Sequence, residues 1–232
     1  MPKRAPLSKR ILYEDNHLIV VNKLPSEIVQ GDKTGDFPLS DKVKEYLKKK
    51  YNKPGNVFTG VIHRLDRPVS GVVIFAKTGK ALSRMNELIK NRKIKKTYWA
   101  IVKNKPKEKE AVLTHFLLRN EKKNKSFISN KKQENSKEAI LTYRLMASSK
   151  DYHLLEVDLQ TGRHHQIRAQ LAAIGCPIKG DLKYGYSRSN KDASISLHAR
   201  SVSFVHPVKK ELLKIEAVPP ADVLWRFFNE KM

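Results

Sequence analysis

The sequence predicts a mixed α+β protein built on a single, largely antiparallel sheet with flanking helices. Apolar runs at 11–23 and 61–76 come in pairs separated by turn-forming residues, which is typical of hairpins. Segments with helical spacing, such as 78–93, lie between the strands. The 232 residues contain no internal repeat and no separate linker, so we expect a basic tail at 1–10 followed by one domain at 11–232.

The first part of the chain predicts a hairpin, two helices and a pair of strands around residues 61–76. The hairpin at 11–23 turns at Asp15 and Asn16, residues that tolerate tight turns. Helical spacing follows at 41–51. In the helix at 78–93, Thr78 can cap the first turn, one face is apolar and the other is basic. The apolar stripe consists of Ala81, Leu82, Met85, Leu88 and Ile89, and the basic face of Arg84, Lys90, Arg92 and Lys93.

The second part predicts further strands around a basic excursion. The segment 94–104 alternates as a strand, with Tyr98, Ala100 and Val102 on one side. Residues 103–138 contain 11 Lys plus Arg against five Glu and are expected to form a basic loop or hairpin. We expect strands at 139–147, 152–160, 197–205 and 211–217, a helix at 164–175, and a last helix at 221–230. That last helix is expected to dock Val223, Leu224, Phe227 and Phe228 on the core.

The composition limits the class of partner. There are 47 Lys plus Arg against 23 Asp plus Glu, a formal net charge of +24, which favours binding to a polyanion such as nucleic acid. No stretch reaches the roughly 20 apolar residues that a membrane-spanning helix needs, and the N-terminus has no apolar signal core. Cys176 is the one cysteine, so no internal disulfide can form. We expect a soluble cytoplasmic protein without membrane association.

Residues 63–71, HRLDRPVSG, place one carboxylate between two arginines at a break between two strands. The charges of Arg64 and Arg67 would favour the ionised form of Asp66 if these side chains converge. Asp66 is then either half of a solvated ion pair at a strand end or a carboxylate held ionised for chemistry. The residues by themselves leave both interpretations open.

The stretch LQTGRHHQIR, at 159–168, is a second candidate. Gly162 lets the backbone turn as a strand ends, and Arg163 then lies at the start of a helix, where it can point across a cleft. His164 and His165 are adjacent and are expected to point to different faces. A metal held by both histidines is therefore not favoured.

Other polar and aromatic residues have two interpretations each. Gln166 and Arg168 either contact phosphate or form the polar face of their helix. Tyr98 either belongs to the core or stacks on a base. His198 and His206 are expected to be hydrogen-bonded structural histidines. The chain has no GxGxxG opening a helix, no GxxxxGK[ST] loop and no HxE followed by CxxC, which disfavours dinucleotide chemistry, P-loop phosphate transfer and zinc deamination.

Five ordered motifs resemble those of the RluA-type pseudouridine synthases. They are HRLD at 63–66 with Ser70 and Gly71 after it, Tyr98 in KKTYWA, TGRHHQIR at 161–168, GDLKYG at 180–185 and LHARSVSFVHP at 197–207. The segment EDNHLIVVNK at 14–23 is also similar to the family's opening segment. The family often has Lys-Pro-x-Gly where this chain has Lys-Leu-Pro-Ser at 23–26, and Val69 replaces a common Thr.

The resemblance implies isomerisation of uridine to pseudouridine in structured ribosomal or transfer RNA, after the base flips out of its stack. It implies the pseudouridine synthase fold, with a central RNA-binding cleft. No cofactor or metal and no protein partner is implied, and we expect a monomer. Many relatives carry an additional N-terminal RNA-binding domain, whereas here the catalytic pattern begins at Ile11, so we expect a stand-alone catalytic domain.

The resemblance also implies roles for individual residues. Asp66 is the essential catalytic carboxylate, by a chemical route that the sequence leaves open, and Arg163 is its charge partner. Tyr98 stacks on the uracil and assists proton removal from C5. Arg64 fills the space that the flipped uridine vacates. The other expected substrate-binding residues are His63, Gln166, Arg168 and Ile167, the last as part of an apolar floor under the base.

RNA contact is expected at the helix of 79–93 and at the excursion of 103–138, although the excursion is equally compatible with a solvated loop. Two other functions remain open from the sequence. One is a noncatalytic RNA-binding or ribosome-assembly module, which would have no need of Asp66, Tyr98 and Arg163 together. The other is a histidine metal-dependent nuclease, which would cut RNA and lose its activity to a chelator.

Overall fold

The computed structural model describes residues 5–32, 34–129 and 131–232. Their contacts divide the chain into two compact units. The first unit is Met1–Ile94 with Arg200–Val218, and the second is Lys95–Ala199 with Pro219–Met232. The division does not decide whether residues 11–232 act as one domain, and that expectation stays a prediction. Within the expected tail at 1–10, residues 1–4 lie outside the described residues, and Leu7–Arg10 form a 3-10 helix, η1, in which Arg10 is buried.

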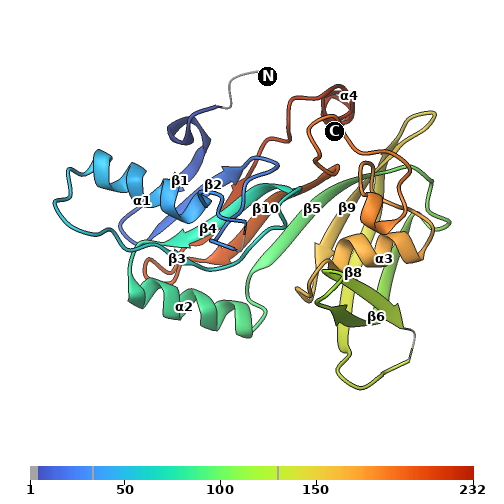
Figure 1. Cartoon of the computed structure of the whole chain (residues 1–232), viewed down its shortest axis with the longest axis horizontal. Helices are drawn as coiled ribbons and strands as arrows, with labels where there is room; N and C mark the ends of the chain where they lie inside the picture. The colour runs from blue at the N-terminus through green and yellow to red at the C-terminus, as the bar shows by residue number, and fades with distance from the viewer. Residues whose placement is uncertain (1–4, 33, 130) are drawn as a thin grey trace. The chain divides into compact units, whose positions relative to one another are not determined.

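The first unit is an antiparallel sheet with two helices. Strand β2 pairs with β1 and β4, β3 pairs with β4, and β11 pairs with β10. Figure 1 shows α2 running along β3 and β4. The elements are β1 (Ile11–Glu14), β2 (Leu18–Lys23), α1 (Leu39–Lys50), β3 (Gly60–Val61), β4 (Ser70–Ala76), α2 (Gly79–Lys90), the part of β10 (Leu197–Val205) from Arg200 onward, and β11 (Leu212–Glu216).

The amphipathic helix predicted at 78–93 is confirmed as α2. The side chain of Thr78 accepts a hydrogen bond from the Ala81 backbone N–H at 3.2 Å, which caps the first turn. All five residues of the expected apolar stripe pack in one cluster with alternate residues of β2 and β4, such as Val20 and Val72. The apolar stripe of α2 therefore covers the sheet face formed by alternate residues of β2 and β4.

Glu14, at the end of β1, fastens α1 to the sheet. It accepts hydrogen bonds from Lys50 Nζ at 2.8 Å, Tyr51 Oη at 2.7 Å and Lys77 Nζ at 3.0 Å. Burial by itself raises the pKa of Glu14, but these hydrogen bonds outweigh it and lower the pKa to about 2. The ionised carboxylate therefore contributes to the stability of the first unit at neutral pH.

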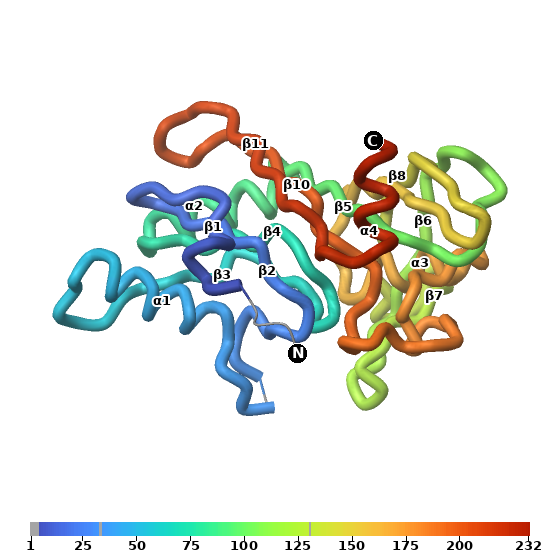
Figure 2. The backbone as a smooth tube through the Cα atoms, turned by 90° about the horizontal axis from the view of Figure 1, so that it is seen from above, coloured from blue at the N-terminus to red at the C-terminus, as the bar shows by residue number. Residues whose placement is uncertain are grey.

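In the second unit, neighbouring strands pair antiparallel in the order β5-β9-β8-β6-β7. The basic excursion expected at 103–138 contains the hairpin of β6 and β7, so the hairpin alternative is correct. Figure 2 shows α3 beside β6 and β7. The elements are β5 (Lys95–Val102), β6 (Glu110–Asn120), β7 (Lys125–Ser129), β8 (Lys137–Ser148), β9 (His153–Leu159), α3 (Gln166–Ala173), the 3-10 helix η2 (Leu182–Tyr184) and α4 (Val223–Asn229).

Helices α3 and α4 cover opposite faces of this sheet. Ala169 of α3 packs with Leu117 and Ala139, whereas Trp225 of α4 packs with Trp99 and Ile101. The strand register places these two clusters on different faces. The mixed α+β class with antiparallel strands is thus confirmed. No described helix has the length and apolar character that crossing a membrane requires.

The expected anchors of the last helix need one correction. Val223 is 72% exposed, whereas Trp225 is 3% exposed and Phe228 is fully buried. Asp222 caps α4 by accepting from the backbone N–H groups of Leu224 and Trp225, so Val223 lies in the first turn and faces outward. The apolar spacing in the sequence allowed either Val223 or Trp225 to face the core, because it does not show at which residue the helix begins.

Candidate active site

Asp66 lies in the connection between β3 and β4, in a tight turn closed by a hydrogen bond from the Val69 backbone N–H to the Asp66 carbonyl oxygen at 3.0 Å. The carboxylate is half-buried. Gly71 follows the turn with φ of +115°, a conformation that side chains disfavour, and it pairs with Lys23 across the sheet. The glycine therefore lets β4 start directly beside the turn that carries Asp66.

Lys23 supports this turn from inside the protein. Its side chain is fully buried at the end of β2, and Nζ donates hydrogen bonds to the carbonyl oxygens of Leu24 at 3.0 Å and Arg67 at 3.1 Å. Burial lowers the pKa of Lys23 to about 7, although the negative charges of Glu27 and Asp66 act in the opposite direction. A buried lysine thus lies directly behind the carbonyl group of Arg67, the residue that follows Asp66.

The segment after β2 holds the same peptide through its backbone. The Ser26 N–H donates to the Arg67 carbonyl oxygen at 2.9 Å. Glu27 is buried and forms ion pairs with Arg10 at 2.7 Å and with Lys42 at 2.8 Å. Burial raises the pKa of Glu27, but hydrogen bonds from these two cations outweigh it, so the pKa lies below its ordinary value. The Asp66 turn therefore rests on an internal network of charges.

The residues around Asp66 differ in their contacts. The Arg67 guanidinium forms an ion pair with Asp36, and Arg64 is exposed. His63 Nε2 accepts a hydrogen bond from the Ile74 backbone N–H at 3.2 Å, so His63 fastens the loop to β4. Arg64 extends to the surface, where it is free of the two contacts that hold Arg67 and His63. The substrate-binding role expected for His63 competes with its bond to the Ile74 backbone.

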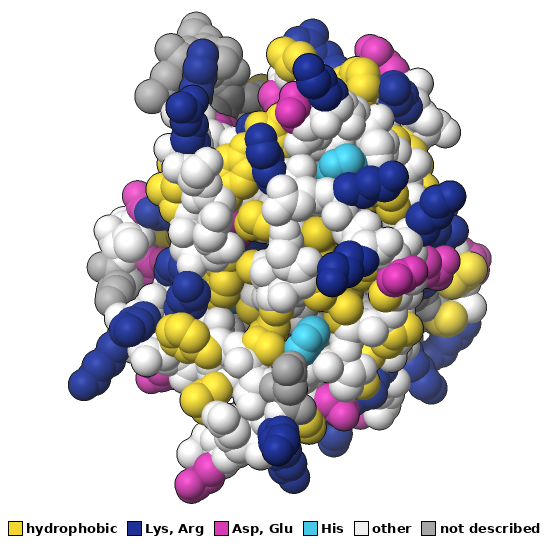
Figure 3. Space-filling view, turned by 90° about the vertical axis from the view of Figure 1, so that its right-hand side faces the viewer, with side chains coloured by type: hydrophobic (Ala, Val, Ile, Leu, Met, Phe, Trp, Pro, Cys, Tyr) yellow, Lys and Arg dark blue, Asp and Glu magenta, His cyan; other side chains and the backbone are white. Residues whose placement is uncertain are grey.

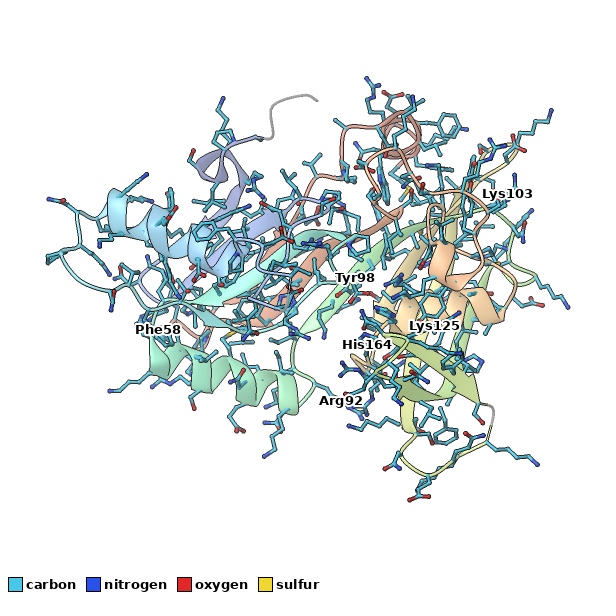
Figure 4. The ribbon with its side chains drawn as sticks, in the orientation of Figure 1. Phe58, Arg92, Tyr98, Lys103, Lys125 and His164 are labelled. Carbon is cyan, nitrogen blue, oxygen red and sulfur yellow. The ribbon has the colours of Figure 1, made fainter. Side chains whose placement is uncertain are left out.

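In the second unit, Tyr98 is a residue of β5 and lies opposite Val157 of β9. The ring is 7% exposed. Figure 4 labels Tyr98 on β5, and Lys125 and His164 elsewhere in the same unit. Strand alternation places Lys96 on the side of Tyr98, and the Nζ of Lys96 lies 3.4 Å from where a Cβ on Gly162 would be. The 161–165 loop thus meets β5 two residues from Tyr98.

The loop that carries Arg163 is held by Gln166, the first residue of α3. Gln166 Oε1 accepts from Thr161 Oγ1 at 2.8 Å and from the Arg163 backbone N–H at 3.0 Å, and its Nε2 donates to the Ile140 carbonyl oxygen at 3.0 Å. The Arg163 Nε–H donates to the Glu138 carbonyl oxygen at 2.9 Å. Arg163 is exposed and precedes the helix by three residues.

The expectation that His164 and His165 point to different faces is wrong. Their rings stack with centroids 3.8 Å apart and planes at 22°. The helix begins only at Gln166, and His165 has φ of +55°, so the helical separation between neighbouring side chains does not apply. His164 Nδ1 lies 3.0 Å from Ser126 Oγ, and His165 Nδ1 lies 3.0 Å from Tyr184 Oη, which ties the loop to β7 and η2.

Gln166 and Arg168 also need a correction. Both are buried, at 2% and 5% exposure, so neither forms an exposed polar face. Arg168 makes a two-point ion pair with the buried Asp181, with Nε to Oδ2 at 2.7 Å and Nη2 to Oδ1 at 2.8 Å. Both side chains thus have partners inside the protein, and the contact with RNA phosphate expected for them stays a prediction. Ile167 is 4% exposed, and its place under the base stays a prediction.

The two other histidines singled out in the sequence are structural. His206 Nδ1 accepts from the backbone N–H groups of Val208 and Lys209, and Nε2 lies 3.1 Å from Asp15 Oδ2. Burial lowers the pKa of His206, although Asp15 acts in the opposite direction. His198 is fully buried, and its ring lies across that of Trp225 with centroids 5.9 Å apart and planes at 61°. Among residues 5–32, 34–129 and 131–232, no group of three His, Cys, Asp or Glu is placed to hold a metal ion.

The three expected catalytic residues come from both units, since Asp66 belongs to the first and Tyr98 and Arg163 belong to the second. The pairing of Arg163 with Asp66 therefore stays a prediction. Sequence reasoning missed the supporting role of Lys23, which it treated only as the start of a divergent motif. The available signal was a lysine two residues after the apolar run LIVV, which predicts a buried strand.

Comparison with known proteins gives one consistent family. A sequence model described as RNA pseudouridylate synthase matches residues 17–173. The ribosomal large subunit pseudouridine synthase C of Buchnera aphidicola subsp. Acyrthosiphon pisum is 35% identical over 228 residues, which cover 94% of this chain and 68% of that protein. The tRNA pseudouridine synthase C of Vibrio parahaemolyticus is 32% identical over 232 residues, which cover 92% of this chain and 91% of that protein.

Solved structures agree on the fold. Human RNA Pseudouridylate Synthase Domain Containing 4 matches with a TM-score of 0.81 and 23% identity, covering 97% of this chain and 93% of that one. Human RNA Pseudouridylate Synthase Domain Containing 1 matches with a TM-score of 0.73 and 23% identity, covering 94% and 86%. At this identity the likeness concerns the arrangement of strands and helices.

Proposed function

Because the chain belongs to the RNA pseudouridylate synthase family, we propose that it isomerises specific uridines of ribosomal or transfer RNA to pseudouridine, with Asp66 as the essential carboxylate. The names of the two relatives cover both RNA classes, one ribosomal and one transfer. We further propose that it acts as a monomer in the cytoplasm, without a protein partner.

The reaction breaks the N1 to C1′ bond of the uridine, turns the uracil, and bonds C5 to C1′. The proton on C5 leaves and N1 gains one, so atoms and electrons balance without an external group. Asp66 takes part as an anion, whether it attacks C1′, adds to C6 or removes the C2′ proton. Each route requires the carboxylate to be held at a fixed place relative to the sugar or base.

The observation that carries the proposal is the construction of the Asp66 turn. A fully buried lysine and the Ser26 N–H both donate to the peptide carbonyl after Asp66. A solvated ion pair at a strand end would need no such support, because exposed ion pairs contribute little. A carboxylate that must be positioned for chemistry does need it, and this supports the catalytic interpretation.

The other roles follow the resemblance. We assign Arg163 as the charge partner of Asp66, and Tyr98 as the residue that stacks on the uracil and assists removal of the C5 proton. Arg64 is exposed beside Asp66 and can fill the stack when the uridine flips out, since a planar guanidinium can replace part of the lost stacking. The hydrogen bond that the Arg163 backbone N–H donates to Gln166 Oε1 supports a fixed place for that arginine.

RNA attraction is assigned to the basic surface of the chain. Figure 3 shows Lys and Arg side chains spread over one face, with fewer Asp and Glu side chains among them. The turn between β6 and β7 carries Lys122 and Lys123, both exposed. The exposed positions of α2 include Lys80, Arg84 and Lys90. Binding through phosphates by such residues is strongly salt-dependent.

The decisive experiment adds the purified protein to unmodified total RNA and maps pseudouridine in each RNA class. The wild type is expected to modify defined positions in ribosomal or transfer RNA, and Asp66→Asn to modify none while it keeps its folded circular dichroism spectrum. The matched control is Asp36→Asn, which removes an exposed carboxylate that pairs with Arg67 of the same turn. This control is expected to retain activity.

The same experiment separates the other functions. A noncatalytic RNA-binding module would bind the RNA and leave every uridine unchanged. A metal-dependent nuclease would shorten the RNA and stop when a chelator is added, whereas we expect intact RNA and no effect of the chelator. An Asp66→Asn protein that is unfolded would assign Asp66 to the turn instead of to the reaction.

A further inference from the structure

Two neighbouring lysines on β5 have opposite surroundings. Strand alternation places Lys95 and Lys96 on different faces of the sheet. The Lys95 side chain is 68% exposed, and its Nζ lies 3.6 Å from Asp158 Oδ2. Lys96 is half-buried, and among the residues that the structure describes no Asp or Glu forms an ion pair with it.

Lys96 therefore carries a desolvation cost that nothing in the described structure offsets. Burial lowers the pKa of Lys96, and no anionic group acts in the opposite direction. A long and flexible lysine side chain normally extends to water to avoid this cost, as Lys95 does. The position of Lys96 makes sense where an anion from outside the chain reaches the ammonium group.

The surroundings identify the kind of anion. Lys96 is two residues from Tyr98 on the same face of β5, a spacing of about 7 Å along a strand. The Nζ lies 3.4 Å from the position that a Cβ on Gly162 would take, so the ammonium group borders the residue before Arg163. A nucleotide whose base lies against the Tyr98 ring has its phosphates at about this separation from the base.

We propose that Lys96 binds a phosphate group of the RNA strand that carries the target uridine. The assignment rests on the proposed function, since it takes Tyr98 as a base-contacting residue. Lys96 is then a substrate-binding residue that fixes the strand next to the reacting nucleotide. Its pairing with phosphate supplies the counter-charge that the protein itself does not provide.

The test compares Lys96→Met with Lys95→Met, which removes the same charge from the adjacent position on the other face. The affinity for a fluorescein-labelled oligouridylate is measured over a series of salt concentrations. Lys96→Met is expected to bind about tenfold more weakly, and the slope of log K against log salt to fall by about 0.7, the loss of one phosphate contact with a single strand. Lys95→Met and the charge-conserving Lys96→Arg are expected to keep the wild-type slope.

Thermal unfolding provides the second measurement. Removing an uncompensated, half-buried charge is expected to leave the midpoint temperature of Lys96→Met unchanged or raised. A clear fall in that midpoint would assign Lys96 to folding, and an unchanged affinity would also overturn the proposal. Weaker binding with an unchanged salt slope would assign Lys96 to a base carbonyl instead of a phosphate. Binding and unfolding do not depend on turnover, so failure of the isomerase experiment would be seen separately.

Discussion

Lys23→Met tests whether the buried lysine behind the Asp66 turn is responsible for a pH dependence of stability. The folded-state pKa of about 7 lies below the ordinary value of 10.5. Between these values the unfolded chain binds more protons than the folded one, so the free energy of unfolding rises with pH. Methionine fills a similar volume and cannot titrate, so the variant should lack this rise.

The expected size follows from the two pKa values. At ~1.4 kcal/mol per tenfold, the full difference between about 7 and 10.5 corresponds to about 5 kcal/mol. This rise in the free energy of unfolding extends from below pH 7 to above pH 10.5. The part of it between pH 7 and about pH 9 is roughly 2 kcal/mol. The wild type is therefore expected to gain about 2 kcal/mol relative to Lys23→Met over this range, whichever protein is more stable at pH 7.

Urea unfolding followed by far-UV circular dichroism measures this difference. Tryptophan fluorescence is unsuitable, because the two tryptophans of the chain, Trp99 and Trp225, both belong to the second unit, whereas Lys23 belongs to the first. Lys48→Met, which removes an exposed lysine of α1, is the matched control and should run parallel to the wild type. If Lys23→Met also runs parallel to the wild type, the lysine does not titrate in this range and the account of the turn is wrong.

Three further changes test other parts of the fold. Ser26 has φ of +68°, so Ser26→Gly, which restores the glycine of the family motif, should raise the free energy of unfolding in urea by about 0.5–1 kcal/mol; a loss would contradict the backbone argument. Glu14→Gln should lower the free energy of unfolding by about 2 kcal/mol at pH 7 and by less at pH 3. The reason is that the contribution of a carboxylate with a pKa of about 2 disappears as pH falls from about 4.5 toward 2. An equal loss at both pH values would exclude a charge effect. Asp181→Asn leaves the buried Arg168 without its counter-charge and should cost about 3–5 kcal/mol in thermal unfolding, whereas a small cost would mean that water reaches the guanidinium.

Elements with a strong local pattern could be predicted from the sequence. The hairpin at 11–23 became β1 and β2, because two apolar runs and the Asp-Asn turn between them act over a few residues. Helix α2 followed from its stripe and its Thr78 cap. In each case the residues that decide the structure are neighbours in the chain, so one sequence is sufficient.

Contacts between distant residues could not be predicted. Arg168 is thirteen residues from Asp181 in the chain, and their buried ion pair depends on how α3 packs against the segment before η2. The stacking of His164 on His165 depends on a left-handed backbone at His165, which favours glycine and gives no signal in the sequence. The helical pattern therefore allowed a polar helix face for Gln166 and Arg168, which their burial excludes.

The family resemblance supplied Asp66, Tyr98 and Arg163, but it could not distinguish the many cations of a chain with a net charge of +24. Their surroundings make that distinction. Arg168 has a buried carboxylate and Lys23 has two backbone carbonyls, so the charges of both are used inside the protein. Lys96 is half-buried with no such group among the described residues. The cations that bind RNA should therefore be sought among exposed or uncompensated side chains, and substitutions at Arg168 should change stability before they change the salt dependence of RNA binding.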